Sequence, residues 1–329
     1  ENTPRLDYSG GATCPSLLLE PSRSNLFDQS EYIDWWSAYS GLLKTANAAT
    51  SPDGGSNAYK LYANSASSKK GIYKSFSVSA SATSFSLFAK AGEIDIVQMG
   101  YGGTYGNTYA NVNLTDGSVE VENGQTTSVE NYGNGWYRIT AVATQTAGGG
   151  YWFANITDDP AMVRNGNYVG NSSDGLYIFG TQLEYGTYPT SYIPTYGVSQ
   201  TRAKDDCINS SLTTSTDFTI FFEAKDFCLI NGSTGGSYDN VQFTFSSSGA
   251  PYDVGGSYHI YGNSLYYYNG STNTSFGLIY NNQTDSKFAL VKRGNQGIVY
   301  ANGVKKTELT LPSGADAKVI NWDAINLTS

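Results

Sequence analysis

The sequence contains few of the residues that catalytic triads and metal centres need. Among its 329 residues there are one His, three Cys and two Met. With His259 as the sole histidine, a Ser/His/Asp triad and a zinc site of several histidines both lack parts, so His259 is expected to be structural. Cys14, Cys207 and Cys228 form no CxxC pair, and their odd number cannot complete a disulfide framework, so buried thiols are expected.

Charge and long apolar runs are also scarce. Charged residues make up 14 % of the chain, and 19 Lys and Arg against 28 Asp and Glu give a net charge of −9. This balance excludes the basic surface that a nucleic-acid partner requires. No apolar run approaches the roughly 18 residues of a spanning helix, so we expect a soluble chain without membrane insertion. Because the chain starts at Glu1 without a signal segment, we expect a fragment or a processed chain, with a last strand missing beyond Trp322.

Gly and aromatic residues are present in excess. The chain has 37 Gly, 27 Tyr and 14 Phe, and it lacks long Glu/Lys-rich amphipathic stretches. Tyr and Phe favour pleated, half-buried surfaces and Gly supplies turns. Residues 84–89 show the period of two of a strand, with Phe85, Leu87 and Ala89 on one face. The sequence therefore predicts an all-β protein, and short alternating runs of this kind are typical of a sandwich or barrel.

The chain is expected to divide into four parts. Residues 1–26 form an irregular N-terminal arm punctuated by proline, and residues 27–197 form the first sandwich. The polar residues 198–206 form a linker, and residues 207–329 form the second sandwich.

Alternating runs bounded by turn residues predict individual strands and two hairpins. The hairpins are expected at Asp116-Gly117 and at Asn302-Gly303, both of which can take the positive φ angles of a type I′ turn. The expected strands are residues 71–78, 84–89, 136–142 and 175–184 in the first sandwich and residues 217–224, 240–245 and 287–292 in the second.

Three segments carry a resemblance to a known family. They are residues 14–26 (CPSLLLEPSRSNL), 134–138 (NGWYR) and 180–195 (GTQLEYGTYPTSYIPT), the last followed by Thr201, Arg202 and Asp205. Together they resemble a module that recurs in bacteriophage and prophage tail or head-fibre proteins, over about residues 3–206. The part from about residue 207 resembles concanavalin A-like or laminin-G-like jelly rolls.

The resemblance implies a virion appendage on the virion surface or outside the cell, built from two tandem jelly-roll β-sandwiches of the carbohydrate-binding type, the first of which resembles a carbohydrate-binding module. Glycans and other virion subunits are then the expected partners. A homo-oligomer, such as a trimer, suits a fibre because linked weak sugar contacts gain avidity.

Aromatic clusters next to polar loops are the candidate glycan-binding residues. A pyranose presents C–H patches to flat rings and hydroxyls to polar groups. Consecutive aromatic residues in an extended segment point to opposite faces, so we expect one indole of the Trp35/Trp36 pair to be exposed. For every cluster the alternative to ligand contact is packing in the core or against another subunit. Trp136 is not a candidate, because we expect it to be buried. The candidates are Trp35, Trp36, Tyr151, Trp152, Tyr266, Tyr267 and Tyr268, with Asn269-Gly270 as a turn.

A structural calcium ion is the metal for which the loops offer ligands. Carboxylates and carbonyls in loops suffice for its oxygen coordination. The candidates are Asp53, Asp158 and Asp159. No spacing resembles an EF-hand, and no other cofactor is expected.

Residues 92–98 (GEIDIVQ) are close to the EIDIVE motif of laminarinase-like retaining glycosidases. In that chemistry the first Glu is the nucleophile and the last Glu the acid/base. Here Gln98 stands in the last position, and an amide cannot carry the proton. We therefore expect a strand with exposed Glu93 and Asp95, and a non-enzymatic protein that binds glycans. The alternatives are purely structural virion decoration and, less favoured, a polysaccharide depolymerase.

Overall fold

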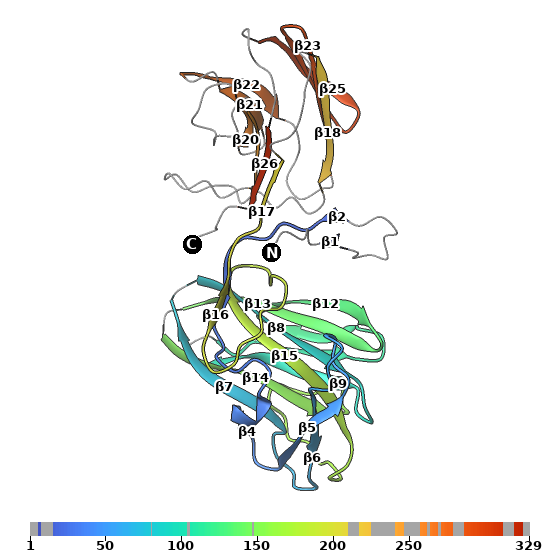
Figure 1. Ribbon diagram of the computed structural model, residues 1–329. Coiled ribbons are helices and arrows are strands. Elements are labelled where there is room, and N and C mark those ends of the chain that lie inside the picture. Colours follow the sequence, from blue (N-terminus) through green and yellow to red (C-terminus); the bar gives the residue numbers. More distant parts are fainter. Residues whose placement is uncertain are drawn as a thin grey trace. The chain divides into compact units, whose positions relative to one another are not determined.

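The computed structural model describes residues 6–7, 16–79, 81–103, 106–146, 148–209, 217–224, 241–246, 257–261, 264–268, 271–278, 286–311 and 319–324 (Figure 1). Apart from one 3-10 turn, η2 (Ile33–Trp35), the regular elements within these ranges are strands, which confirms the predicted all-β class. The chain divides into two compact units. One is Arg23–Arg202, and the other combines the described residues before Arg23 with those from Ala203 onward. No helix in the described ranges is long and apolar enough to cross a membrane.

The unit Arg23–Arg202 contains two six-stranded antiparallel sheets. We name them after their central strands. The β9/β14 sheet has the order β11 (Val119–Asn123), β10 (Tyr109–Asn113), β9 (Ile96–Gly103), β14 (Gly148–Thr157), β7 (Gly71–Val78) and β4 (Ser37–Ala38). The β8/β15 sheet has the order β12 (Thr126–Gly133), β13 (Trp136–Gln145), β8 (Ser81–Lys90), β15 (Gly175–Tyr185), β6 (Ala58–Ala63) and β5 (Leu42–Ala49).

Aromatic side chains fill the space between these two sheets. Trp152 on β14 is fully buried, and its ring centroid lies 3.6 Å from that of Phe85 and 4.8 Å from that of Trp36. Phe27 packs edge-on against Trp36 at 4.8 Å. The expected alternation in β8 is confirmed, because Phe85, Leu87 and Ala89 all belong to this core. The core therefore fixes which side chains of each strand point outward.

The outer face of the β8/β15 sheet is covered by the chain itself. Phe88, Trp136 and Phe179 form a second buried cluster, against which Tyr192 packs. Trp136 is thus buried as expected, and its indole N–H donates to the Thr50 carbonyl at 3.1 Å. This face is apolar because the segment that follows β15 returns across it.

Buried polar contacts tie that returning segment to the sheet. Glu184 is fully buried and accepts hydrogen bonds from the Thr190 backbone N–H at 2.8 Å and its hydroxyl at 2.6 Å. Arg138 donates to the Thr190 carbonyl at 2.7 Å. Asn25 donates to the carbonyls of Thr181 and Ile193. The three segments that carry the family resemblance therefore meet in one network of buried hydrogen bonds.

The segments expected to be an arm and a linker contain short strands. β3 (Arg23–Asn25) pairs with β16 (Gln200–Arg202), so part of the expected linker belongs to the first unit. Before it, β1 (Leu6–Asp7) pairs with β2 (Ser16–Leu17). Pairing of this kind needs only backbone groups, which explains why polar residues without a hydrophobic face form strands here.

The second unit also contains two antiparallel sheets. The six-stranded sheet has the order β17 (Asp206–Asn209), β26 (Val319–Ala324), β19 (Val241–Ser246), β20 (Ser257–Tyr261), β21 (Ser264–Tyr268) and β22 (Asn273–Leu278). The four-stranded sheet has the order β18 (Phe218–Ala224), β23 (Ser286–Arg293), β24 (Gln296–Ala301) and β25 (Val304–Thr310). His259 lies in β20 and Cys207 in β17. Cys14, Cys228 and the expected turn Asn269-Gly270 lie outside the described residues.

Both predicted hairpins are present, but only one of them has the predicted two-residue turn. Asn302 and Gly303 have φ angles of 49° and 78°, as a type I′ turn between β24 and β25 requires. Between β10 and β11, Gly117 has a positive φ but Asp116 does not, and the loop spans residues 114–118. Asn113 closes this longer loop: its carbonyl accepts from the Gly117 N–H at 2.8 Å, its N–H donates to the Ser118 carbonyl at 2.9 Å, and its side-chain oxygen accepts from the Thr115 N–H at 2.9 Å.

We expect Trp152→Ala to destabilise the first unit by about 3–5 kcal/mol, because it leaves a large cavity in the aromatic core. Trp35→Ala is the matched control, since that indole is 75 % exposed and its loss should change the free energy of unfolding by about 0.5 kcal/mol or less. Urea unfolding followed by tryptophan fluorescence measures both. Similar losses for the two variants would contradict the central position of Trp152.

Candidate functional site

Three tyrosines form a row on the outer face of the β9/β14 sheet. Because Trp152 points into the core, its neighbour Tyr151 points outward, and Tyr73 does the same on β7 next to buried Ile72. Tyr39 follows β4 and stacks on Tyr73, with ring centroids 4.9 Å apart and an interplanar angle of 27°. Tyr73 meets Tyr151 edge to face at 6.3 Å. We call Tyr39, Tyr73 and Tyr151, all half-buried, the tyrosine row.

A cation stands at each end of the tyrosine row. The Arg164 Nη2 group donates to the Tyr101 carbonyl at 2.7 Å and to the Tyr151 hydroxyl at 3.3 Å. Its guanidinium lies 5.1 Å from the ring centroid of Phe153, at cation–π distance. At the other end, the Lys69 ammonium lies 5.5 Å from the ring centroid of Tyr39.

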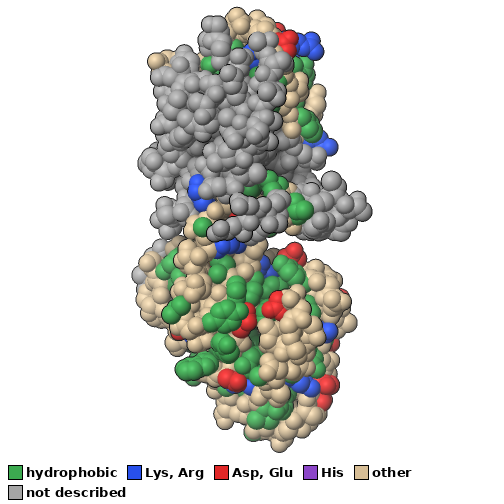
Figure 2. Space-filling model, viewed as in Figure 1, with side chains coloured by type: hydrophobic (Ala, Val, Ile, Leu, Met, Phe, Trp, Pro, Cys, Tyr) green, Lys and Arg blue, Asp and Glu red, His purple; other side chains and the backbone are tan. Residues whose placement is uncertain are grey.

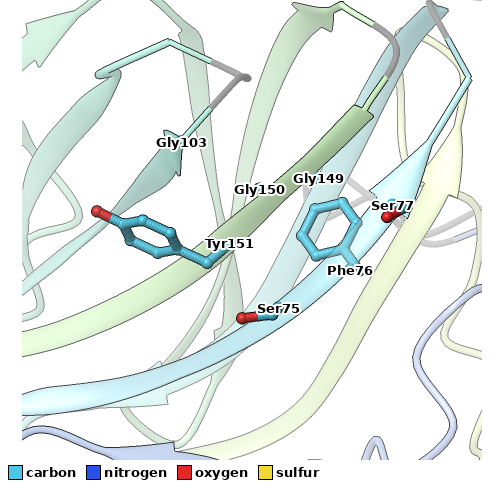
Figure 3. A pocket seen from close by; sticks show the side chains of 7 residues that line it. All are labelled: Ser75, Phe76, Ser77, Gly103, Gly149, Gly150 and Tyr151. Carbon is cyan, nitrogen blue, oxygen red and sulfur yellow. The ribbon is translucent and has the colours of Figure 1, made fainter.

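Glycines make room for this arrangement. A Cβ on Gly102 would collide with the Tyr151 ring and with Arg164 Nη2, so the absence of a side chain lets both lie close over β9. Beside Tyr151 there is an open groove of about 530 Å³, and Figure 3 shows the ring extending from β14 toward the strand that ends at Gly103. The groove is lined by Ser75, Phe76, Ser77, Gly103, Gly149, Gly150 and Tyr151.

The phenol of Tyr39 stays protonated at physiological pH. Burial, together with nearby Tyr151 and Tyr73, raises the pKa of Tyr39 to about 12, although Arg164 acts in the opposite direction. Protonated phenols act as hydrogen-bond donors as well as flat apolar surfaces. The row can therefore contact both the C–H face and the hydroxyls of a sugar.

A cluster of buried amides continues the same sheet face beyond the row. Gln98 donates to Asn111 Oδ1 at 2.8 Å and to the Val163 carbonyl at 3.1 Å, and accepts from the Asn165 backbone N–H at 2.7 Å. Asn155 donates to Asn165 Oδ1 at 2.9 Å. These bonds hold the segment that carries Arg164 over the sheet, which gives Gln98 a structural role.

The glycosidase-like segment differs from the expected strand. Glu93 and Asp95 lie in the loop before β9, because β9 begins only at Ile96. Glu93 forms an ion pair with Lys60 at 2.8 Å and accepts a hydrogen bond from the Gly175 backbone N–H at 3.1 Å. The Lys60 hydrogen bond lowers the pKa of Glu93. Glu93 therefore connects this loop to β6 and β15.

Trp35 lies on a separate exposed turn. It is 75 % exposed while Trp36 is 2 % exposed, so one indole faces out and one in as expected, but in η2 instead of an extended segment. The Lys44 ammonium donates to the carbonyls of Ile33, Asp34 and Trp36 at 3.0 to 3.2 Å, which holds this turn.

Charged side chains are sparse on the face of this unit seen in Figure 2.

The structure corrects three of the sequence-predicted aromatic candidates. Trp36, Trp152 and Tyr267 are buried, so their rings cannot stack on a ligand. Trp152 was expected near a loop and Trp36 in an extended segment, but the two rings lie 4.8 Å apart in the core. Trp35 is exposed and Tyr151 and Tyr266 are half-buried, so these three stay candidates, while the side chain of Tyr268 lies outside the described residues.

Sequence analysis missed Tyr39, Tyr73 and Arg164. Tyr73 could have been found, because it faces outward in the alternating run of residues 71–78. Tyr39 and Arg164 come from segments outside the long strands, and only the fold brings them to this face.

The proposed calcium ligands have other partners. Asp53 accepts a hydrogen bond from the Gly55 backbone N–H at 2.8 Å, and Asp159 accepts one from that of Ala161 at 2.9 Å. Asp158 is exposed. Within the described ranges, no three His, Cys, Asp or Glu side chains gather where they could hold a metal ion.

The comparisons with known proteins are sparse. No protein-family model and no curated protein matches the chain. Among solved structures it is similar to domains LG4-5 of the mouse laminin α1 chain, with 9 % identity over 96 % of this chain and 90 % of that one, at a TM-score of 0.21. The fold assignment therefore rests on the sheets themselves.

Glu31 beside the Trp35 turn should make stability depend on pH. Burial raises its pKa above 4.5, the nearby charge of Asp53 adds to this, and the hydroxyls of Tyr196 and Tyr192 hydrogen-bond to it. A raised folded-state pKa means that the contribution of Glu31 to stability is fully present below its unfolded pKa and is lost as the pH rises through the folded one.

Glu31→Gln should therefore raise the melting temperature near pH 7 and raise it less near pH 4. The amide oxygen of Gln keeps an acceptor for both hydroxyls. Thermal unfolding at the two pH values measures the difference, and an equal shift at both would rule out a buried charge as the cause.

Proposed function

We propose that the unit Arg23–Arg202 binds glycans on the outer face of its β9/β14 sheet. The observation that carries the proposal is the tyrosine row beside an open groove of about 530 Å³. Flat rings cover the C–H patches of a pyranose, while phenols, serine hydroxyls and a guanidinium bond to its hydroxyls. Ser75 and Ser77 are exposed on the same strand as Tyr73.

We further propose that the chain is part of a bacteriophage tail or head-fibre appendage. This rests on the sequence resemblance of residues 14–26, 134–138 and 180–195. An oligomeric appendage would multiply weak sugar contacts, because linked sites bind with a high effective concentration. Such a protein acts at the virion surface or outside the cell.

The proposed activity is binding without cleavage. Retaining hydrolysis needs a nucleophile and a proton carrier placed about 5 Å apart. Gln98 lacks an ionisable proton and is committed to the amide cluster, and Glu93 is paired with Lys60. These contacts favour binding over catalysis at this segment.

A purely structural role is the second candidate, and the Trp35 turn favours it. Tyr32 and Tyr196 are exposed near this turn and meet edge to face at 6.1 Å. Exposed aromatic residues that are held rigidly are typical of protein–protein contacts. In this role Trp35 would be covered by another subunit.

Removing rings from the tyrosine row tests the glycan proposal. Tyr73→Ala and Tyr151→Ala should each weaken glycan binding about tenfold, because each removes a stacking surface. Gly102→Ala keeps every ring but displaces Tyr151 and Arg164, so it should also weaken binding. The measurement is a glycan array of the full chain, followed by titration of the best ligand.

Tyr132→Ala is the matched control, because Tyr132 is an exposed tyrosine on β12 of the other sheet. Its binding should equal that of the unmodified protein. Unchanged glycan binding in Tyr73→Ala, Tyr151→Ala and Gly102→Ala would refute the site. Loss of assembly in Trp35→Ala, measured by sedimentation, together with no glycan binding by the unmodified chain, would establish the structural role instead.

A further inference from the structure

We propose that the glycan bound by the tyrosine row is acidic, with a carboxylate that Arg164 and Lys69 recognise. This inference rests on the proposed function and names its ligand class. A row of tyrosines alone suits a neutral sugar. The two cations at its ends are the feature that a neutral sugar does not explain.

Several lysines of the described part are ion-paired, and others, such as Lys44, donate to backbone carbonyls. Lys60 pairs with Glu93, Lys74 with Asp28 and Lys305 with Glu308. Within the part of the chain that the structure describes, neither Arg164 nor Lys69 has a carboxylate partner, although acidic residues outnumber basic ones by 28 to 19.

The guanidinium of Arg164 is fixed by hydrogen bonds that do not use all of its N–H groups. Both of its hydrogen bonds use Nη2, while Nε is buried without a partner among the described residues. The Nη1 group makes no hydrogen bond to any of them. The guanidinium is fixed over Phe153, its Nε is buried and its Nη2 is already used twice, so Nη1 is the group left to donate to a ligand carboxylate.

Two cations border the row: the Lys69 ammonium lies next to the Tyr39 ring, and Arg164 is hydrogen-bonded to the Tyr151 hydroxyl. Lys69 is exposed next to that ring, so its ammonium is open to a ligand. A sugar stacked on the row would place its substituents within reach of one cation at either end.

The test compares an oligosaccharide containing glucuronic acid with its carboxyl-reduced form, in which an uncharged hydroxymethyl group replaces the carboxylate. The full chain should bind the acidic form about tenfold more tightly. Arg164→Gln should bring the two affinities together, and Arg164→Lys should restore part of the preference because it keeps the charge but loses the planar group held over Phe153. Lys305→Gln, in the other unit, is the control and should leave the preference unchanged.

Lys69→Glu provides an independent variant. Lys69 is exposed and makes no hydrogen bond within the described part of the chain, so this change should not disturb folding but should lower affinity for the acidic form more than for the reduced one. Lys69→Glu therefore tests the recognition of the carboxylate even if Arg164→Gln disturbs the chain segment around residue 164. A sulfated version of the reduced oligosaccharide shows whether sulfate can replace the carboxylate.

Equal binding of both forms that is lost in Tyr73→Ala would overturn the acidic ligand and leave the glycan site intact. A preference for the acidic form that survives both Arg164→Gln and Lys69→Glu would overturn the role of these cations. If neither form of the oligosaccharide nor any glycan on the array binds, the site and its ligand class fail together.

Discussion

The register of β14 is the constraint on which the first unit depends. Trp152 sits between Phe85 and Trp36 at the centre of the aromatic core, where no smaller side chain would fill the space. Because side chains alternate along a strand, placing Trp152 inside forces Tyr151 and Phe153 outside. A slip of one residue would expose the indole and bury the phenol. The same contact that stabilises the core therefore also creates the outer aromatic surface.

The two outer faces of the sandwich differ in whether the chain covers them. The outer face of the β8/β15 sheet is covered by the chain itself, which is held there by hydrogen bonds of Glu184, Thr190 and Asn25. The segments with the strongest family resemblance thus explain how the unit closes, not what it binds. The β9/β14 sheet is covered over its amide cluster, but the tyrosine row next to it stays accessible. A ligand of this unit is accordingly best accommodated on that side.

Sequence analysis predicted the all-β class and most long strands, because an alternating pattern is a local property. It placed residues 71–78 and 175–184 correctly, and likewise the turn at Asn302-Gly303. It failed at Asp116-Gly117, where hydrogen bonds of Asn113 close a longer loop that the turn residues do not reveal. The site was only partly predictable. Residue type marks an aromatic ring, but the core decides whether that ring faces inward, as for Trp152, or outward, as for Tyr151.

If the chain binds an acidic glycan as proposed, the binding must overcome the chain's own negative charge. The net charge of −9 repels such a ligand at long range, but at physiological salt interactions between exposed charges fade beyond roughly 8 Å. At contact distance the fixed guanidinium of Arg164 and the ammonium of Lys69 outweigh distant carboxylates, since Coulomb energy falls with separation and the rings beneath them exclude water. Recognition would then be confined to the tyrosine row, while the rest of the acidic surface discourages nonspecific adhesion of polyanions. Sparse charge elsewhere and two uncompensated cations at one site are thus parts of a single arrangement.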